Sequence, residues 1–350
     1  MAGVLHGITV VELAGIGPGP FAGMMLADHG ARVIRIERPG PRHESDFGKR
    51  DAVNRNRELR TIDLKDPAGL AEVLAVLDVA DALIEGFRPG VIERLGLGRD
   101  VLHRRNPRLV IGRMSGFGQT GPRALQAGHD INYIALSGAL STYGRKGEPP
   151  VVPANAVGDY AGGGMMLAFG VLAAILSARS TGHGQVVDCA MSDGAALISA
   201  FTYSGFANGW WVEERESNVC DGGAYFYDTY ETSDGKYVSI GAIEPQFQAL
   251  LLEKLGLTGD PGFAAPMDRS RWPELKQRLA AIFRTRTRDE WCALLDHTET
   301  CFAPVLTLSE APREPHNVAR GTFVEVGGVI QPAPAPRFSL TPAPPVRMPE

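Results

Sequence analysis

The chain has 350 residues, of which 44% are hydrophobic and 21% are charged. This length is enough for one large domain or two moderate domains, each with its own core. The formal net charge of −5 argues against a general nucleic-acid-binding protein. We expect no membrane-spanning segment, because no apolar run reaches spanning length and the apolar stretch from Met165 to Ala178 reads as a buried core helix. The N-terminus lacks the basic and apolar regions of a signal peptide.

Four cysteines lie far apart and form no C-x-x-C pair. This spacing is typical of reduced thiols and predicts neither a disulfide framework nor a metal site. Together with the missing signal peptide, it predicts a cytoplasmic protein.

The first 37 residues predict a β-α-β unit. Residues 8–13 and 32–37 are rich in β-branched residues, and a helical stretch to about His29 separates them. The turn Gly15-Ile16-Gly17-Pro18-Gly19-Pro20 invites a dinucleotide interpretation, with Glu37 as a ribose ligand. Pro20 stands where the third glycine of that motif belongs, so a plain tight turn is the better explanation.

Residues 38–65 carry eight basic side chains and five acidic ones. A solvated charged loop is the usual explanation for such a segment. The functional alternative is a phosphate-binding lip, because arginine matches phosphate geometry. The basic members are Arg38, Arg42, Lys49, Arg50, Arg55, Arg57, Arg60 and Lys65, and Arg88 and Arg94 could extend the set.

Further strands are expected at 82–85, 109–115 and 184–189, with helices between them. This alternation predicts an α/β fold with a Rossmann-like, mostly parallel sheet that binds ligands beyond the carboxyl ends of its strands. After about residue 210 the pattern changes to a hairpin around Ser233-Asp234-Gly235 and three helical stretches, which indicates a smaller α+β domain. The proline-rich stretch from Gln331 onward should be extended or disordered.

The candidate chemistry centres on His129 and Asp159. An imidazole titrates near neutral pH and can act as a general base. Asp159 precedes the glycine-rich stretch 161–164, where free N–H groups at a helix start could hold an oxyanion. That position would lower the pKa of the Asp159 carboxyl, whereas burial would raise it. Taken alone, His129 is better explained as a satisfied core histidine, and the pairing with Asp159 and the flanking motifs reverse this preference. Asp159 could simply cap the helix, a role that is compatible with catalysis.

Several ordered motifs resemble the α-methylacyl-CoA racemases, members of the family III CoA-transferase superfamily. The motifs lie at residues 11–20, 85–90, 118–122, 128–133, 158–159, 184–188 and 241–247. The resemblance implies a large CoA-binding domain at 1–189, to which residues 320–350 return, and a small α+β domain at 220–292. It also implies a linker helix at 190–219 and a second linker at 293–319. The subunits would form an interlocked homodimer, with the active site between the large domain of one and the small domain of its partner. Related chains extend further beyond the proline-rich tail, so we expect a shortened C-terminal segment here.

The same resemblance implies roles for single residues. His129 would take the α-proton of a 2-methyl-branched acyl-CoA, Asp159 would return it on the opposite face, and Glu244 would belong to a polar network with His129. The reaction needs no cofactor, and CoA is part of the substrate. The residues expected to bind the substrate are Ile16, Arg38, Arg55, Ile62, Asp63, Leu64, Lys65, Gly86, Phe87, Arg88, Arg94, Gly128, Ile131, Asn132 and Tyr133.

Three rival functions stay open at this point. In CoA-transferase relatives, an aspartate in the motif that contains Asp130 is the nucleophile that forms an acyl anhydride, so transferase activity is the main alternative. If the chain is a racemase, Asp130 should instead orient His129. An NAD-dependent oxidoreductase, suggested by the glycine-rich turn, and a non-catalytic CoA-binding protein rank below these.

Overall fold

The computed structural model describes residues 2–40 and 50–349. The chain divides into two compact units, formed by Met1–Ala139, Pro153–Ala200 and His316–Glu350, and by Leu140–Val152 and Phe201–Pro315. The short stretch Leu140–Val152 groups with the second unit, in which Arg145 pairs with Glu216 and Asp228.

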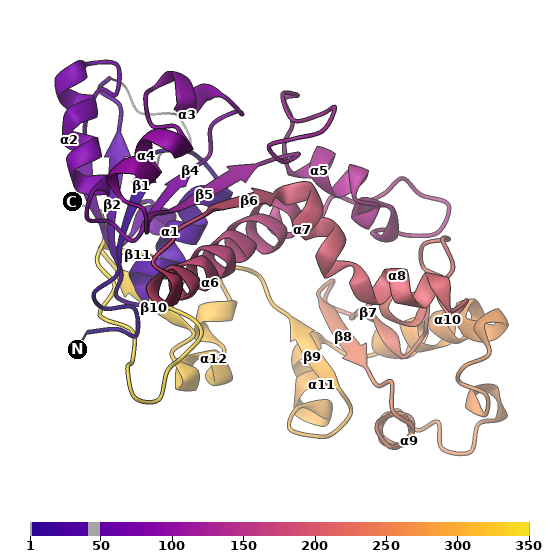
Figure 1. Ribbon diagram of the computed structural model, residues 1–350. Coiled ribbons are helices and arrows are strands. Elements are labelled where there is room, and N and C mark those ends of the chain that lie inside the picture. Colours follow the sequence, from indigo (N-terminus) through magenta and orange to yellow (C-terminus); the bar gives the residue numbers. More distant parts are fainter. Residues whose placement is uncertain (1, 41–49, 350) are drawn as a thin grey trace. The chain divides into compact units, whose positions relative to one another are not determined.

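A six-stranded, fully parallel sheet forms the centre of the first unit (Figure 1). Its strands in spatial order are β3 (Arg57–Thr61), β2 (Arg32–Glu37), β1 (Thr9–Leu13), β4 (Ala82–Glu85), β5 (Val110–Ser115) and β6 (Val186–Ala190). The order reverses between β1 and β4, which is where ligands bind in folds of this type. The predicted Rossmann-like parallel sheet is therefore confirmed.

Helices cover both faces of this sheet. The helices outside the second sheet's unit are α1 (Pro18–Asp28), α2 (Pro67–Leu77), α3 (Val91–Arg94), α4 (Arg99–Arg105), α5 (Asp130–Leu136), α6 (Met166–Thr181), α7 (Met191–Ile198) and α12 (Pro315–Arg320). Successive strand residues point to opposite faces. Val10 accordingly packs in one cluster with α1 and α6, whereas Val11 packs in another with α2, α3 and α4.

A π-helix, Ala156–Met165, directly precedes α6. The two form one helical stretch of 26 residues, Ala156–Thr181, which contains an 18-residue window with a mean hydropathy of 1.8. Our expectation that no apolar run reaches membrane-spanning length is therefore wrong on length and composition. Half of this window is buried within the protein, and α6 packs against β5 and β6, as in the core helix of a globular domain.

The second unit is built on a three-stranded antiparallel sheet in the order β7 (Tyr227–Glu231), β8 (Tyr237–Gly241) and β9 (Phe302–Val305). The predicted hairpin at Ser233-Asp234-Gly235 is the β7–β8 connection. The remaining helices are α8 (Ala200–Ala207), α9 (Pro245–Lys254), α10 (Trp272–Phe283) and α11 (Arg288–Leu295). Aromatic side chains of β7, α10 and α11 form the core, in which Tyr230 stacks on Phe283 with ring centroids 5.0 Å apart. The smaller α+β domain is thus present.

The proline-rich C-terminal stretch follows a short hairpin of β10 (Phe323–Val326) and β11 (Val329–Pro332). From Ala333 to Pro349 it contains neither helix nor strand. This chain is held against the first unit by hydrogen bonds, among them the bond from the Arg347 N–H to Asn56 Oδ1.

Candidate active site

A cavity of about 1300 Å³ lies at the carboxyl ends of the parallel strands in the first unit. The segments that follow β1, β2, β3, β4 and β5 all contribute to its lining. The turn Gly15–Gly19 lies on one side of the reversal in strand order and Gly86–Arg88 on the other. The cavity therefore occupies the position that strand topology assigns to a ligand.

His129 lines this cavity from the residue that precedes α5. Its N–H donates to Asn132 Oδ1 at 3.0 Å, and the Tyr133 hydroxyl donates to the carbonyl of Gly128. The Tyr133 ring is in turn confined, because a Cβ on Gly116 would lie 2.2 Å from its Cε1. Backbone and ring packing together fix the point from which the imidazole projects.

Asp159 lines the same cavity from the π-helix. Our expectation that a helix starts after Asp159 is wrong, because the helical turns begin at Ala156 and are wider than α-helical turns. A π-helical insertion is rare and is found disproportionately at functional sites.

Asp130 does not line the cavity, although it follows His129 directly. It is 5% exposed, and its Oδ2 accepts hydrogen bonds from the N–H groups of Gly158 at 2.7 Å and Asp159 at 2.8 Å. These two amides are therefore not available for an oxyanion. Asp130 joins the start of α5 to the π-helix, which is a different contact from the one we predicted, with His129.

The pKa of the Asp159 carboxyl is raised, mainly by burial. The Asn155 amide donates to its Oδ2 at 3.1 Å and acts in the opposite direction, as does nearby His129, whereas Asp130 adds to the rise. A raised pKa increases the share of the acid form, which is the form that can donate a proton. Sequence reasoning missed Asn155, although its spacing of four residues from Asp159 is the spacing of helical neighbours.

A set of basic side chains lies at the rim of the cavity. Arg38, Lys65 and Arg88 are exposed there, and no acidic side chain among the described residues pairs with them. Unpaired cations at the mouth of a cavity suit a ligand with phosphate groups. Arg42 and Lys49 of the predicted basic lip lie outside the described residues.

Most of the predicted substrate-binding residues line this cavity together. Besides Arg38, Lys65 and Arg88 they are Ile16, Ile62, Asp63, Leu64, Gly86, Phe87, Gly128, Asn132 and Tyr133. Three others are placed elsewhere. Ile131 is 42% exposed, Arg94 is exposed at the end of α3, and the Arg55 guanidinium is buried against Asp28. Glu244 belongs to the second unit, at the N-terminal cap of α9.

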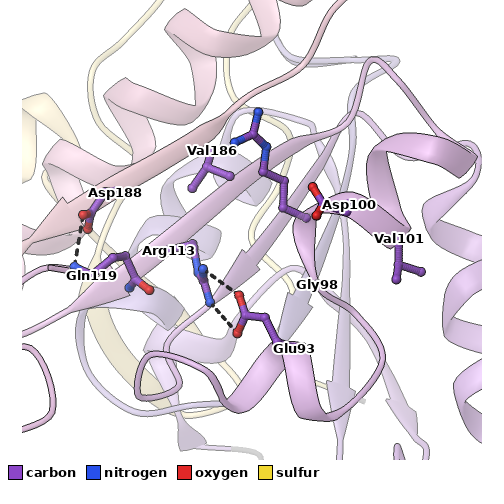
Figure 2. Close-up of a pocket in the computed structure, with 9 residues that line it drawn as sticks. Glu93, Gly98, Asp100, Val101, Arg113, Gln119, Val186 and Asp188 are labelled. Carbon is purple, nitrogen blue, oxygen red and sulfur yellow. Dashed lines mark hydrogen bonds and ion pairs between the residues drawn. The ribbon is translucent and has the colours of Figure 1, made fainter.

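A second, smaller pocket of about 710 Å³ lies beside β5 and β6 (Figure 2). Charged side chains dominate its lining, but many of them are already paired. The Arg113 guanidinium bonds Glu93 and Glu85, and the Asp188 carboxylate accepts the N–H of Gln119. None of the predicted catalytic residues lines it. The larger cavity is therefore the candidate active site.

Known proteins resemble this chain over nearly its whole length. The chain is 45% identical to the human α-methylacyl-CoA racemase over 97% of this chain and 87% of the relative. It is 32% identical to the succinyl-CoA–D-citramalate CoA-transferase of Chloroflexus aurantiacus, over 97% of this chain and 88% of that one. A solved CaiB/BaiF family protein from Brucella suis superposes with a TM-score of 0.84 at 27% identity, covering 100% of this chain and 97% of the other. The sequence model of the protein family named CoA-transferase family III matches residues 5–349 of this chain. The chain therefore belongs to this family.

Proposed function

We propose that the protein is a racemase that interconverts the R and S isomers of 2-methyl-branched acyl-CoA thioesters. The observation that carries the proposal is that His129 and Asp159, from two different elements, line one cavity. The rim of this cavity holds cations that no acidic side chain of residues 2–40 and 50–349 pairs with. The 45% identity to the human α-methylacyl-CoA racemase supports it. Arg38, Lys65 and Arg88 would bind the phosphates of CoA and direct the acyl thioester toward the pair.

The proposed reaction removes one proton from the α-carbon and adds another on the opposite face. The thioester acidifies the α-carbon, so His129 can take the proton from one face and leave an enolate. Asp159, in its acid form, then gives a proton to the opposite face, and the reverse direction exchanges the two roles. The raised pKa of Asp159 supports its role as the proton donor, because an ordinary aspartate is almost fully deprotonated near neutral pH.

Exchange of the α-proton with solvent tests the proposal. In D₂O the purified protein should replace the α-proton of a 2-methylacyl-CoA with deuterium, as followed by mass spectrometry. His129→Ala and Asp159→Asn should each lower the rate of racemisation by about a thousandfold or more, because each removes a required proton-transfer group. His183→Ala and Asp289→Asn, which change exposed side chains of the same types elsewhere, are the matched controls. Full racemisation in either site variant, or no exchange with any branched acyl-CoA, would refute the proposal.

CoA transfer is the second candidate, supported by the 32% identity to a CoA-transferase. Asp130 is poorly placed as its nucleophile, because its carboxylate is buried under two backbone amides. Asp159 lines the cavity beside His129 and Asp130 does not, so Asp159 is the better candidate nucleophile of the two. Incubation with an acyl-CoA and a free carboxylic acid would then give a new thioester, and His129→Ala would retain this activity.

A homodimer is part of the proposal. Helices of the first unit leave large apolar side chains exposed on the single chain, namely Ile131, Leu136, Phe169, Leu176, Leu197 and Ile198. Exposed apolar surface of this extent is typical of a protein-protein interface.

A further inference from the structure

The C-terminal segment Gln331–Arg347 contacts the end of α1 and the residues just before β3. Arg55 is the centre of this contact. Its Nε and Nη2 donate to the two carboxylate oxygens of Asp28 at 2.9 and 2.5 Å. Its Nη1 donates to Gln331 Oε1 at 2.8 Å and to the carbonyl of Pro332 at 2.6 Å. The guanidinium thus makes four hydrogen bonds in a buried site, which explains why Arg55 does not line the cavity.

Asn56 makes a second, reciprocal contact with the same segment. Its N–H donates to the carbonyl of Arg347 at 2.9 Å, and the N–H of Arg347 donates to Asn56 Oδ1 at 2.7 Å. The Asn56 amide also donates to Asp28 Oδ1 at 2.7 Å. Asn56 has a φ of 63°, a left-handed conformation that asparagine tolerates better than most residues.

The residues immediately before Arg55 belong to the cavity wall. Asp51, Val53 and Asn54 line the cavity, and the Asp51 carboxylate accepts the N–H of Val53 and the amide of Asn54. Arg57 donates to the carbonyl of Val53 and pairs with buried Glu12. The wall is therefore held by the sheet through Arg57 and by the C-terminal segment through Arg55 and Asn56.

We propose that Gln331–Arg347 is a strap that sets the position of the cavity wall at Asp51–Asn54, so that Arg55 and Asn56 are positioning residues for the CoA part of the substrate. Neither side chain touches the ligand. Loosening the strap lets the wall shift and weakens CoA binding while the proton-transfer pair stays in place. The inference rests on the proposed function only for the identity of the ligand.

Two variants loosen the strap by independent routes. Asn56→Gly keeps a residue that adopts positive φ freely, but it removes the side-chain bonds to Arg347 and Asp28. A chain that ends at Pro345 lacks Arg347 and leaves Asn56 unchanged. The matched control is Asn208→Gly, which removes an amide that donates to the carbonyl of Ser204 one helical turn away.

The readout is the dissociation constant of free CoA by calorimetry, on variants shown to be folded by circular dichroism, together with kcat and KM. Each variant should weaken CoA binding by about tenfold and raise KM with kcat nearly unchanged, because displaced binding groups act on affinity. Combining the two should add little, since both break the same contact. Unchanged CoA affinity in both folded variants, even with lower thermal stability, would overturn the strap and leave a purely structural role. Because CoA binding is measured without turnover, this outcome is distinct from failure of the racemase proposal.

Discussion

The surroundings of Asp159 stabilise both protonation states of its carboxyl. Burial favours its neutral acid form, and the Asn155 amide favours its carboxylate form. In the proposed reaction Asp159 gives a proton in one direction and takes one in the other. A carboxyl whose environment pushes its pKa in both directions suits this exchange better than one that is locked in either form.

Removal of the Asn155 amide should change the pH profile of the enzyme. Asn155→Leu removes a hydrogen bond that stabilises the charged form, so the pKa of the Asp159 carboxyl should rise further. In the direction in which Asp159 takes the α-proton it must be a carboxylate, and below its pKa it already carries a proton. The acidic limb of kcat/KM against pH should therefore move to higher pH, whereas the alkaline limb should move less. If the acidic limb does not move in a folded variant, Asn155 does not affect the protonation of Asp159.

At the scale of elements, the π-helix is held by unusually close contacts with α7. A Cβ on Gly194 of α7 would lie 1.8 Å from the carbonyl oxygen of Gly162, and a Cβ on Gly162 would lie 2.7 Å from the N of Ala195. Only glycine allows two helical backbones to approach so closely. This contact fixes the π-helix, and with it the backbone that carries Asp159.

Gly194→Ala should therefore be costly. The added methyl group meets backbone atoms that cannot rotate away, so α7 and the π-helix must separate. Overpacking of this kind destabilises a protein by about 1–3 kcal/mol. Urea denaturation measures this loss, with Ser192→Ala on the same helix as the control, and the racemisation rate should fall as Asp159 moves. A loss below about 0.5 kcal/mol, the range of ordinary surface substitutions, would contradict the tight contact.

At the scale of the whole molecule, a substitution in the exposed apolar surface of α6 can test the proposed dimer. Phe169 is 68% exposed and Leu176 is 69% exposed on the single chain. Phe169→Glu places a charge in that face, and the dimer would have to bury this unpaired carboxylate. The mass measured by light scattering should therefore shift from dimer toward monomer. His183→Glu, on an already exposed polar position, should leave the mass unchanged. A wild-type protein that is monomeric at micromolar concentration would contradict the dimer directly.

Sequence patterns predicted the fold better than the local contacts of the site. Alternating strands and helices were sufficient for the parallel sheet, because runs such as Val33–Ile36 bury both faces. The π-helix could not be predicted, since its apolar and glycine pattern fits an α-helix equally well. The true contact of Asp130 was also missed. Neighbours in a helical turn point about 100° apart, so adjacency to His129 did not place its side chain in the cavity.

The contact between the strap and residues 55–56 could not be predicted from the sequence either. Asn56 and Arg347 are 291 residues apart, and no local pattern links them. Arg55 was predicted among the substrate-binding residues because arginine suits phosphate. Only the packed structure reveals that its guanidinium makes four hydrogen bonds, to Asp28, Gln331 and a backbone carbonyl.

The carboxylate of Asp130 has a consequence for motion in the site. One buried oxygen accepts the N–H groups of Gly158 and Asp159, so the start of α5 and the π-helix cannot open separately. Amide hydrogen exchange should then find these two protons among the slowly exchanging ones, released together in a single opening event. His129 and Asp159 would then move together. The distance between them would stay nearly constant while other parts of the cavity wall fluctuate.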